Sequence, residues 1–157
     1  MVREEKIEVK AMCLFIHEGR VLVSNGRTIR GKGVDSPIVP GGFYRVLGGS
    51  MNFNETSEQG VRREIMEELK SEINNLKFLE VVENLFIYGG EKCHEIVFLF
   101  AGELTKKDLY KQEVIHIIDN DYAFNAVWIS LDDIFNGKTP LYPSTDYKSI
   151  FTKLEVI

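Results

Sequence analysis

The sequence contains little of what builds disulfide scaffolds and zinc sites. Of its 157 residues only two are cysteines, Cys13 and Cys93, and only three are histidines. Both cysteines lie inside apolar runs, and the histidines are isolated, without the spacing that zinc ligands usually have. We therefore expect two reduced core thiols, and neither a disulfide framework nor a zinc cluster.

Long apolar runs and an excess of positive charge are also missing. No stretch is long enough to span a bilayer, and the first ten residues contain no apolar signal-peptide core, so we expect a cytoplasmic protein with no membrane partner. The net charge is -5, which disfavours the binding of long nucleic acids. A small anionic substrate is compatible with this charge when a bound metal supplies positive charge.

The length and the periodicity of the sequence predict one continuous α/β domain over residues 1–157. No repeat, low-complexity tract or linker-like segment interrupts it. Strand-like segments surround one central helix and are followed by another, which predicts a mixed sheet with helices on both faces. The expected strands are Ile7–His17, Arg20–Ser24, Phe43–Leu47, Lys77–Tyr88, His94–Leu104 and Ala126–Ser130; turns fall at Glu18–Gly19 and Gly89–Gly90, a helical turn at Leu131–Phe135, and a helix capped from Ser144 or Thr145 at Asp146–Leu154.

The segment Asn25–Gly42 is rich in turn-forming residues. It holds five of the 13 glycines and two of the four prolines, so we expect a long surface loop. Its stretch Gly26–Lys32 has the spacing of a phosphate-binding loop, but Gly33 occupies the Ser or Thr position and no helix follows, so we reject that assignment. Arg45, on the strand after the loop, is the favoured contact for substrate phosphate. Arg27 is a second candidate for this contact. The alternative interpretation is that Arg27 is a loop cation exposed to solvent.

A central helix is predicted to begin at Ser57, because Thr56 and Gln59 have the spacing of a capping box. At about 100° per residue the side chains of this helix separate into an apolar arc and an acidic arc. The apolar arc contains Val61, Ile65, Leu69 and Ile73, and the acidic arc contains Glu64, Glu67 and Glu68.

The acidic arc is the first indication of chemistry. Carboxylates at positions i, i+3 and i+4 repel one another, at a cost of about 0.2–0.5 kcal/mol per close pair in an isolated helix. Solvent or a bound cation must offset this cost. Mg²⁺ and Mn²⁺ prefer oxygen ligands of this kind and commonly bridge substrate phosphates. Taken alone, however, such spacing is more typical of a solvated acidic helix face.

Three neighbouring residues favour the metal site over a solvated face. Gly49 lacks a Cβ atom, so a backbone carbonyl there can approach a metal closely. Arg63 lies beside the acids and can pair with Glu55, which would pin the preceding loop to the helix.

Together these residues form the pattern G-x5-E-x7-R-E-U-x-E-E, in which U is a bulky aliphatic residue. The pattern lies within Gly49–Ser71 and resembles the signature box of the Nudix hydrolases. This resemblance implies a Nudix-type α/β/α sandwich with a mixed sheet. It also implies a metal-dependent attack of water on a phosphorus atom of a nucleoside diphosphate that is linked to another group.

Carried over by position, the resemblance makes Glu64, Glu67, Glu68 and the Gly49 carbonyl ligands of Mg²⁺ or Mn²⁺. Glu55 and Arg63 become orienting groups. The general base is Glu64 itself or a carboxylate outside the box, for which Glu113 is the first candidate and Glu95 the second. The expected partner is a small nucleotide-derived substrate. The oligomeric state is left open, and a homodimer is compatible with the sequence.

The end of the box departs from the family pattern. Lys70 and Ser71 replace a glycine and an aliphatic residue, so we expect the helix to continue to about Ile73 and to close at Asn74 or Asn75.

The loop before the helix departs as well. Asn52 and Asn54 stand where many relatives carry Glu and Gly; Asn54 tolerates a left-handed backbone, whereas Asn52 removes a carboxylate. Asn52 and Lys70 favour an alternative function, a Nudix-like module that binds a nucleotide without cleaving it. A structural domain with a solvated acidic helix is a third interpretation. We expect substrate specificity to reside in Asn25–Gly42 and Thr105–Asn125.

Overall fold

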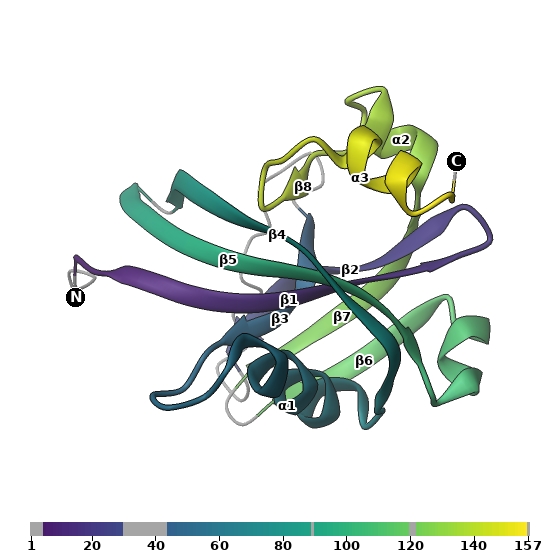
Figure 1. The fold of residues 1–157 in the computed structure, drawn as a ribbon, viewed down its shortest axis with the longest axis horizontal. Coiled ribbons are helices and arrows are strands. Elements are labelled where there is room, and N and C mark those ends of the chain that lie inside the picture. The colour runs from purple at the N-terminus through teal and green to yellow at the C-terminus, as the bar shows by residue number, and fades with distance from the viewer. Residues whose placement is uncertain (1–4, 30–43, 89, 120–121, 157) are drawn as a thin grey trace.

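The computed structural model describes residues 5–29, 44–88, 90–119 and 122–156 (Figure 1). Strands dominate these ranges, with three α-helices and one 3₁₀-helix. In chain order the elements are β1 (Ile7–His17), β2 (Arg20–Ile29), β3 (Tyr44–Ser50), α1 (Ser57–Leu69), β4 (Ile73–Tyr88), β5 (Glu91–Leu104), η1 (Lys107–Lys111), β6 (Val114–Asp119), β7 (Tyr122–Ser130), α2 (Leu131–Phe135), β8 (Leu141–Tyr142) and α3 (Tyr147–Lys153).

The strands form one mixed sheet in the order β4-β5-β1-β3-β2-β7-β6, with β8 paired to β3. The sheet is mixed because β1 runs parallel to β5 but antiparallel to β3. Figure 1 shows α1 below the strands and α2 and α3 above them. This arrangement confirms the predicted α/β/α sandwich.

Strand β1 serves both hydrophobic cores because its side chains alternate between the two faces of the sheet. Ala11, Cys13 and Phe15 belong to the core that α1 covers, whereas Met12 and Leu14 belong to the core under α2 and α3. Cys13 and Cys93 are free and buried, as expected from the sequence. Within the described ranges, no helix is long and apolar enough to cross a membrane.

The predicted hairpin of the first two strands is confirmed, and its second strand is longer than expected. Glu18 and Gly19 form the turn with positive φ angles. Strand β2 extends to Ile29, which contradicts the prediction that the loop begins at Asn25. Pairing with β7 holds this extension, after a register shift between Ser24 and Arg27. The rest of the predicted loop, residues 30–42, lies outside the described residues.

Other boundaries also differ from those predicted. Strands β4, β5 and β7 begin earlier than expected, because pairing with neighbouring strands extends them. Helix α2 has the predicted bounds. Helix α3 begins at Tyr147, and its N-cap is Asp146, whose carboxylate accepts a hydrogen bond from the backbone N–H of Ser149. The sequence did not predict η1, β6 or β8.

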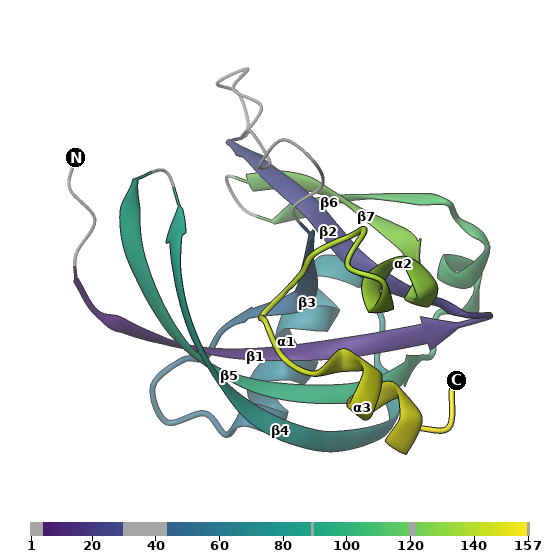
Figure 2. The same ribbon diagram turned by 90° about the horizontal axis from the view of Figure 1, so that it is seen from above.

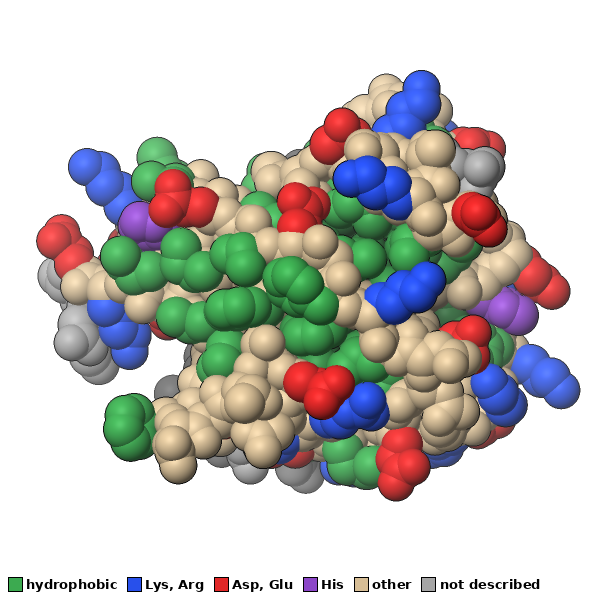
Figure 3. All heavy atoms as spheres, viewed as in Figure 1, with side chains coloured by type: hydrophobic (Ala, Val, Ile, Leu, Met, Phe, Trp, Pro, Cys, Tyr) green, Lys and Arg blue, Asp and Glu red, His purple; other side chains and the backbone are tan. Residues whose placement is uncertain are grey.

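The outer face of β4 is apolar and exposed beyond the area that α1 covers. Figure 3 shows hydrophobic side chains gathered over β4 and β5 on this side. Phe78, Val81, Leu85 and Ile87 of β4 contribute to this surface, together with Ile7 of β1. Among the described strands, β4 has no neighbour on its other edge.

Candidate metal centre

Helix α1 positions most of the predicted site residues, and its first turn forms as the sequence predicts. The hydroxyl of Thr56 accepts a hydrogen bond from the backbone N–H of Gln59, and the Gln59 side chain accepts one from the N–H of Thr56. Val61, Ile65 and Leu69 are buried and fix the rotation of the helix on the sheet. The acidic residues therefore occupy fixed positions relative to β3.

The predicted continuation of α1 to Ile73 is wrong, because the helix ends at Leu69. Lys70 itself adopts the left-handed conformation, with φ 56°, and donates its backbone N–H to the carbonyl of Met66. Its side-chain Nζ donates to the carbonyl of Glu67 at 2.6 Å. Ile73 already belongs to β4 and pairs with Leu104. The lysine thus takes the conformation that a glycine usually supplies here.

Gly49 of β3 lies directly against the Glu64 side chain of α1. A Cβ atom on Gly49 would lie 2.4 Å from the Glu64 carboxyl carbon and 2.4 Å from its Oε2 atom. The missing side chain therefore leaves room for the Glu64 carboxylate against the strand backbone. The carbonyl of the next residue, Ser50, accepts a hydrogen bond of 2.9 Å from Arg63.

Arg63 connects the loop to the acidic face of α1. Its Nε and Nη2 atoms donate to the two oxygens of Glu55 at 2.7 and 2.9 Å, which is a bidentate pair. Its Nη1 atom donates to Glu64 at 2.9 Å and to both oxygens of Glu67 at 3.3 Å. The proposed pairing of Arg63 with Glu55 is therefore present, and the same guanidinium orients two of the helix carboxylates.

Glu55 is held in its ionised form. The hydrogen bonds from Arg63, and then the backbone N–H of Asn52 at 2.9 Å, lower the pKa of the Glu55 carboxyl to about 2. Asn54, just before it, has φ 65°, as expected for a residue that replaces a turn glycine. The loop and the helix thus form one hydrogen-bonded unit.

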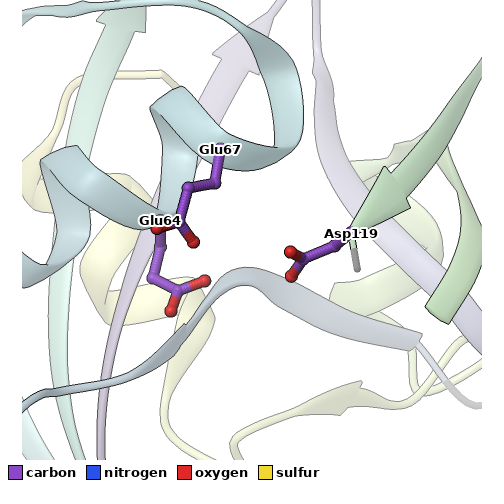
Figure 4. A group of neighbouring side chains, drawn as sticks. All are labelled: Glu64, Glu67 and Asp119. Atoms are coloured by element: carbon purple, nitrogen blue, oxygen red, sulfur yellow. The ribbon is translucent and has the colours of Figure 1, made fainter. Parts of the chain in front are cut away.

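A third acid joins Glu64 and Glu67 from another part of the sheet. Figure 4 shows the carboxylate of Asp119, at the end of β6, directed toward Glu64 and Glu67 of α1. One ligand atom from each of these residues lies within 4.8 Å of the others. Burial raises the pKa of Glu64, and the charges of Glu67 and Asp119 act in the same direction, while Arg63 opposes them. A hard divalent cation suits this set of oxygens.

The burial of the helix acids decides against a solvated acidic face. Glu64 is only 8% exposed and Glu68 only 6%, so two of the three carboxylates are largely removed from water. Buried carboxylates require compensation by hydrogen bonds, opposite charge or a metal. Glu68 lies outside the group formed by Glu64, Glu67 and Asp119. Its role as a ligand therefore rests on the sequence pattern.

The structure does not bring the two candidate bases outside the box to this group. Glu113 is exposed and precedes β6, at the opposite end from Asp119, which corresponds to about 20 Å along an extended chain. Glu95 is buried on β5 and accepts a hydrogen bond of 3.0 Å from Nη2 of Arg45. Arg45 is therefore engaged with a carboxylate of the protein. For Arg27, the structure describes the backbone on β2 but not the side chain.

Asp119 is a candidate site residue that sequence reasoning missed. Strand β6 alternates, with Ile115 and Ile117 buried in the core that α1 covers, and Asp119 follows in the same alternation. This alternation indicates that Asp119 faces α1, since an acid at the end of such a strand reaches the edge of the sheet next to the helix. The signal was obscured because the segment is short and lies between polar stretches.

Known proteins resemble this chain in sequence pattern and in fold. The family model described as NUDIX domain matches residues 7–150. A search of curated proteins gave no significant match. Among solved structures, a MutT NUDIX hydrolase from Burkholderia pseudomallei is 23% identical, with a TM-score of 0.51 over 93% of this chain and 95% of that chain.

Two further solved structures are similar over most of their length. A NUDIX hydrolase from Nitrosomonas europaea is 17% identical, with a TM-score of 0.55 over 86% of this chain and 81% of that chain. A mutator MutT protein from Bacillus halodurans is 16% identical, with a TM-score of 0.51 over 92% of this chain and 80% of that chain. At these identities the likeness concerns the fold.

Proposed function

Since this chain belongs to the Nudix hydrolase family, we propose that it hydrolyses a pyrophosphate bond in a nucleoside diphosphate derivative, with Mg²⁺ or Mn²⁺ as cofactor. The observation that carries this proposal is the convergence of Glu64, Glu67 and Asp119, with ligand atoms within 4.8 Å of one another, next to the backbone of Gly49. Glu68, on the same helix, is proposed as a further ligand.

The charges of the site support the requirement for a divalent cation. Glu55, Glu64 and Glu67 each pair with the guanidinium of Arg63, and Asp119 lies close to Glu64 and Glu67. In the described part of the chain, these four carboxylates give the site an excess of negative charge. A phosphate group would be repelled from such a site. A bound divalent cation would supply positive charge, lower the pKa of a water and orient the leaving group.

The protein groups around that cation have separable tasks in this proposal. Arg63 donates a hydrogen bond to Oε1 of Glu64 and so fixes the orientation of this carboxylate near Asp119. Gly49 keeps the backbone of β3 close to the same carboxylate. Glu64 and Asp119 are the two candidates for the base that takes a proton from the attacking water, because both belong to the converging group. Glu113 and Glu95 are less favoured, because they lie apart from it.

The test is a hydrolysis assay in Mg²⁺ or Mn²⁺ with nucleoside triphosphates, ADP-ribose, nucleotide sugars and dinucleoside polyphosphates. Released phosphate or nucleoside monophosphate is measured. We expect turnover of at least one compound, and its loss in Glu67→Gln. The matched control is Glu58→Gln, which makes the same chemical change at an exposed position on the first turn of α1. Equal activity of the Glu67 variant and the wild type would overturn the assignment.

The alternative function is a nucleotide sensor that binds without cleavage. Asn52 supports it, since its exposed side chain replaces a carboxylate that many relatives carry. Binding of a nucleotide without turnover across the whole panel would favour the sensor. A solvated structural helix would give neither nucleotide binding nor a rise in melting temperature with Mg²⁺.

A further inference from the structure

A second group of polar side chains is buried away from α1, near the hairpin end of β4 and β5. Asn84 on β4 and Glu95 on β5 are direct cross-strand neighbours. Their side chains are only 3% and 2% exposed. They share the inner face of the sheet with Val82 and Val97, which belong to the core under α2 and α3. A carboxylate and an amide at such positions require an explanation.

Arg45 reaches this pair from β3. Its Nη2 atom donates to Oε1 of Glu95 at 3.0 Å, although β1 separates β3 from β5 in the sheet. Figure 2 shows why this contact is possible: the sheet is strongly bent, and the free end of the β4–β5 hairpin curves to the same side as the far end of β2. The guanidinium forms an ion pair with the Glu95 carboxylate, and a carboxylate group accepts hydrogen bonds at both of its oxygens.

The cluster has unused hydrogen-bonding capacity. Among the described residues, Nδ2 of Asn84 has no hydrogen-bond partner although it is buried. Glu95 accepts the hydrogen bond of Arg45 at Oε1, and a carboxylate has further lone pairs that can accept another donor. A buried polar group without a partner destabilises the folded protein and therefore requires an explanation, such as a bound ligand, water or ion. The cluster therefore offers a donor and an acceptor side by side.

Aromatic side chains flank these groups. Phe86 follows Asn84 by two residues on the same face of β4, and its ring centre lies 5.9 Å from the guanidinium carbon of Arg45. Tyr142, the cross-strand neighbour of Arg45 on β8, places its ring 6.4 Å from that of Phe86. A planar ligand can stack on rings of this kind while its edge forms hydrogen bonds.

The cluster is connected to the acidic site through β3. Arg45 lies four residues before Gly49 on this strand, and Gly49 lies against the carboxylate of Glu64. Four residues of extended strand correspond to about 13 Å between Arg45 and Gly49. The sugar and diphosphate of a nucleotide can extend over such a separation.

We propose that Asn84 and Glu95 are specificity-determining residues that bind the nucleobase of the substrate, with Asn84 donating to a base acceptor and Glu95 accepting a base N–H. This inference rests on the proposed function, which it deepens by placing the base at one end of β3 and the phosphorus at the other. Arg45 is a positioning residue that orients Glu95. Phe86 supplies a stacking surface.

The test is calorimetric titration of the full chain with AMP, GMP, CMP, UMP and ribose 5-phosphate in Mg²⁺. None of these ligands contains a pyrophosphate bond, so the proposed activity does not hydrolyse them. We expect at least one nucleotide to bind about tenfold more tightly than ribose 5-phosphate, which has no base. Asn84→Leu should weaken that nucleotide about tenfold, the usual effect of a single lost hydrogen bond, and should leave ribose 5-phosphate unchanged. Glu95→Gln, which gains a donor, should change the order of preference among the four bases.

Stability separates recognition from a purely structural role. Because Asn84→Leu replaces an unsatisfied buried amide by an apolar side chain with the same branching, its melting temperature should equal or exceed that of the wild type. The control Asn74→Leu makes the same change at an exposed position of β4 and should not affect binding. A large fall in melting temperature for Asn84→Leu, with equal losses for all five ligands, would show that Asn84 is structural and overturn the proposal.

The outcomes for the two proposals are distinguishable. Base-selective binding that depends on Asn84, without turnover of any compound in Mg²⁺, would contradict the proposed hydrolysis but support the proposed base-recognition site. Turnover of nucleotides with equal kcat/KM in the wild type and in Asn84→Leu would support the proposed hydrolysis but contradict the proposed base-recognition site. Equal binding of all four nucleotides and ribose 5-phosphate to the wild type would also contradict it.

Discussion

Replacement of Gly49 by alanine tests whether the acidic site depends on the close approach of β3 to α1. The added Cβ atom would lie 2.4 Å from both the carboxyl carbon and Oε2 of Glu64, whereas ordinary van der Waals contact begins at 3.4 Å. The Glu64 carboxylate must therefore move by about 1 Å, or β3 must move by a similar distance. Either movement breaks the geometry that joins Glu64 to Arg63 and Asp119.

The displacement sets the size of the expected effect. A misplacement of about 1 Å at a reacting centre can lower the rate about 100-fold. Overpacking of a close contact typically costs about 1–3 kcal/mol of the free energy of unfolding. We therefore expect Gly49→Ala to fold, to lose about 100-fold in kcat/KM for the compound that the wild type hydrolyses, and to bind Mg²⁺ more weakly.

The assay combines steady-state kinetics with a Mg²⁺ titration followed by melting temperature. Gly102→Ala is the control, because its Cβ would lie 2.5 Å from Cγ2 of Ile73, a comparable overlap against an apolar side chain. This control should lose stability but keep its response to Mg²⁺. If Gly49→Ala retained kcat/KM within about threefold and the same Mg²⁺ midpoint, the close approach would have no role in the site.

Three further outcomes follow from the same geometry. Asp119→Asn should lower kcat/KM about 100-fold or more, whereas Glu113→Gln should leave kcat/KM within about twofold of the wild type in the same assay. A larger loss in Glu113→Gln than in Asp119→Asn would contradict the placement of the base or ligand on β6. Because the pKa of Glu55 is lowered to about 2 from 4.5, its contribution to the free energy of unfolding should be complete above pH 4.5 and be lost as the pH falls toward 2. Denaturant unfolding of the wild type and Glu55→Gln across this range measures that contribution, and a constant difference would contradict the pairing with Arg63. Lys70→Gly should raise the free energy of unfolding by about 0.5–1 kcal/mol, because glycine adopts the left-handed conformation of this position without strain. A fall in the free energy of unfolding would show that the hydrogen bond from Lys70 to Glu67 contributes more than this strain costs.

Sequence predicted the helix half of the site because that half is determined locally. The capping box of Thr56 and Gln59 depends on residues three apart, and the apolar spacing of Val61 and Ile65 fixes the face that packs on the sheet. The end of the helix was wrong, because the backbone conformation of Lys70 depends on the start of β4 and its pairing with β5. Helix propensity alone does not include the effect of this strand pairing on where the helix ends.

The sheet half of the site required three-dimensional information. Asp119 reaches the acids of α1 only because β6 pairs with β7 at the edge of the sheet. Arg45 lies in a segment that was predicted correctly as a strand, but its partner Glu95 lies on a strand two positions away across a bent sheet. Such contacts depend on strand order and curvature, which neither composition nor periodicity specifies.

The parallel pairing of β1 with β5 has a consequence for the order of folding. Strand β1, the first of the described strands, lies in the interior of the sheet, but its neighbour β5 follows only after α1 and β4. Non-local pairings of this kind form slowly, because a long loop must close before they become favourable. During synthesis α1 can form its capped first turns early, while Asp119 emerges far later. We therefore expect a chain truncated before β6 to lack selective Mg²⁺ binding, so that the cation stabilises the completed sheet and does not guide the helix to it.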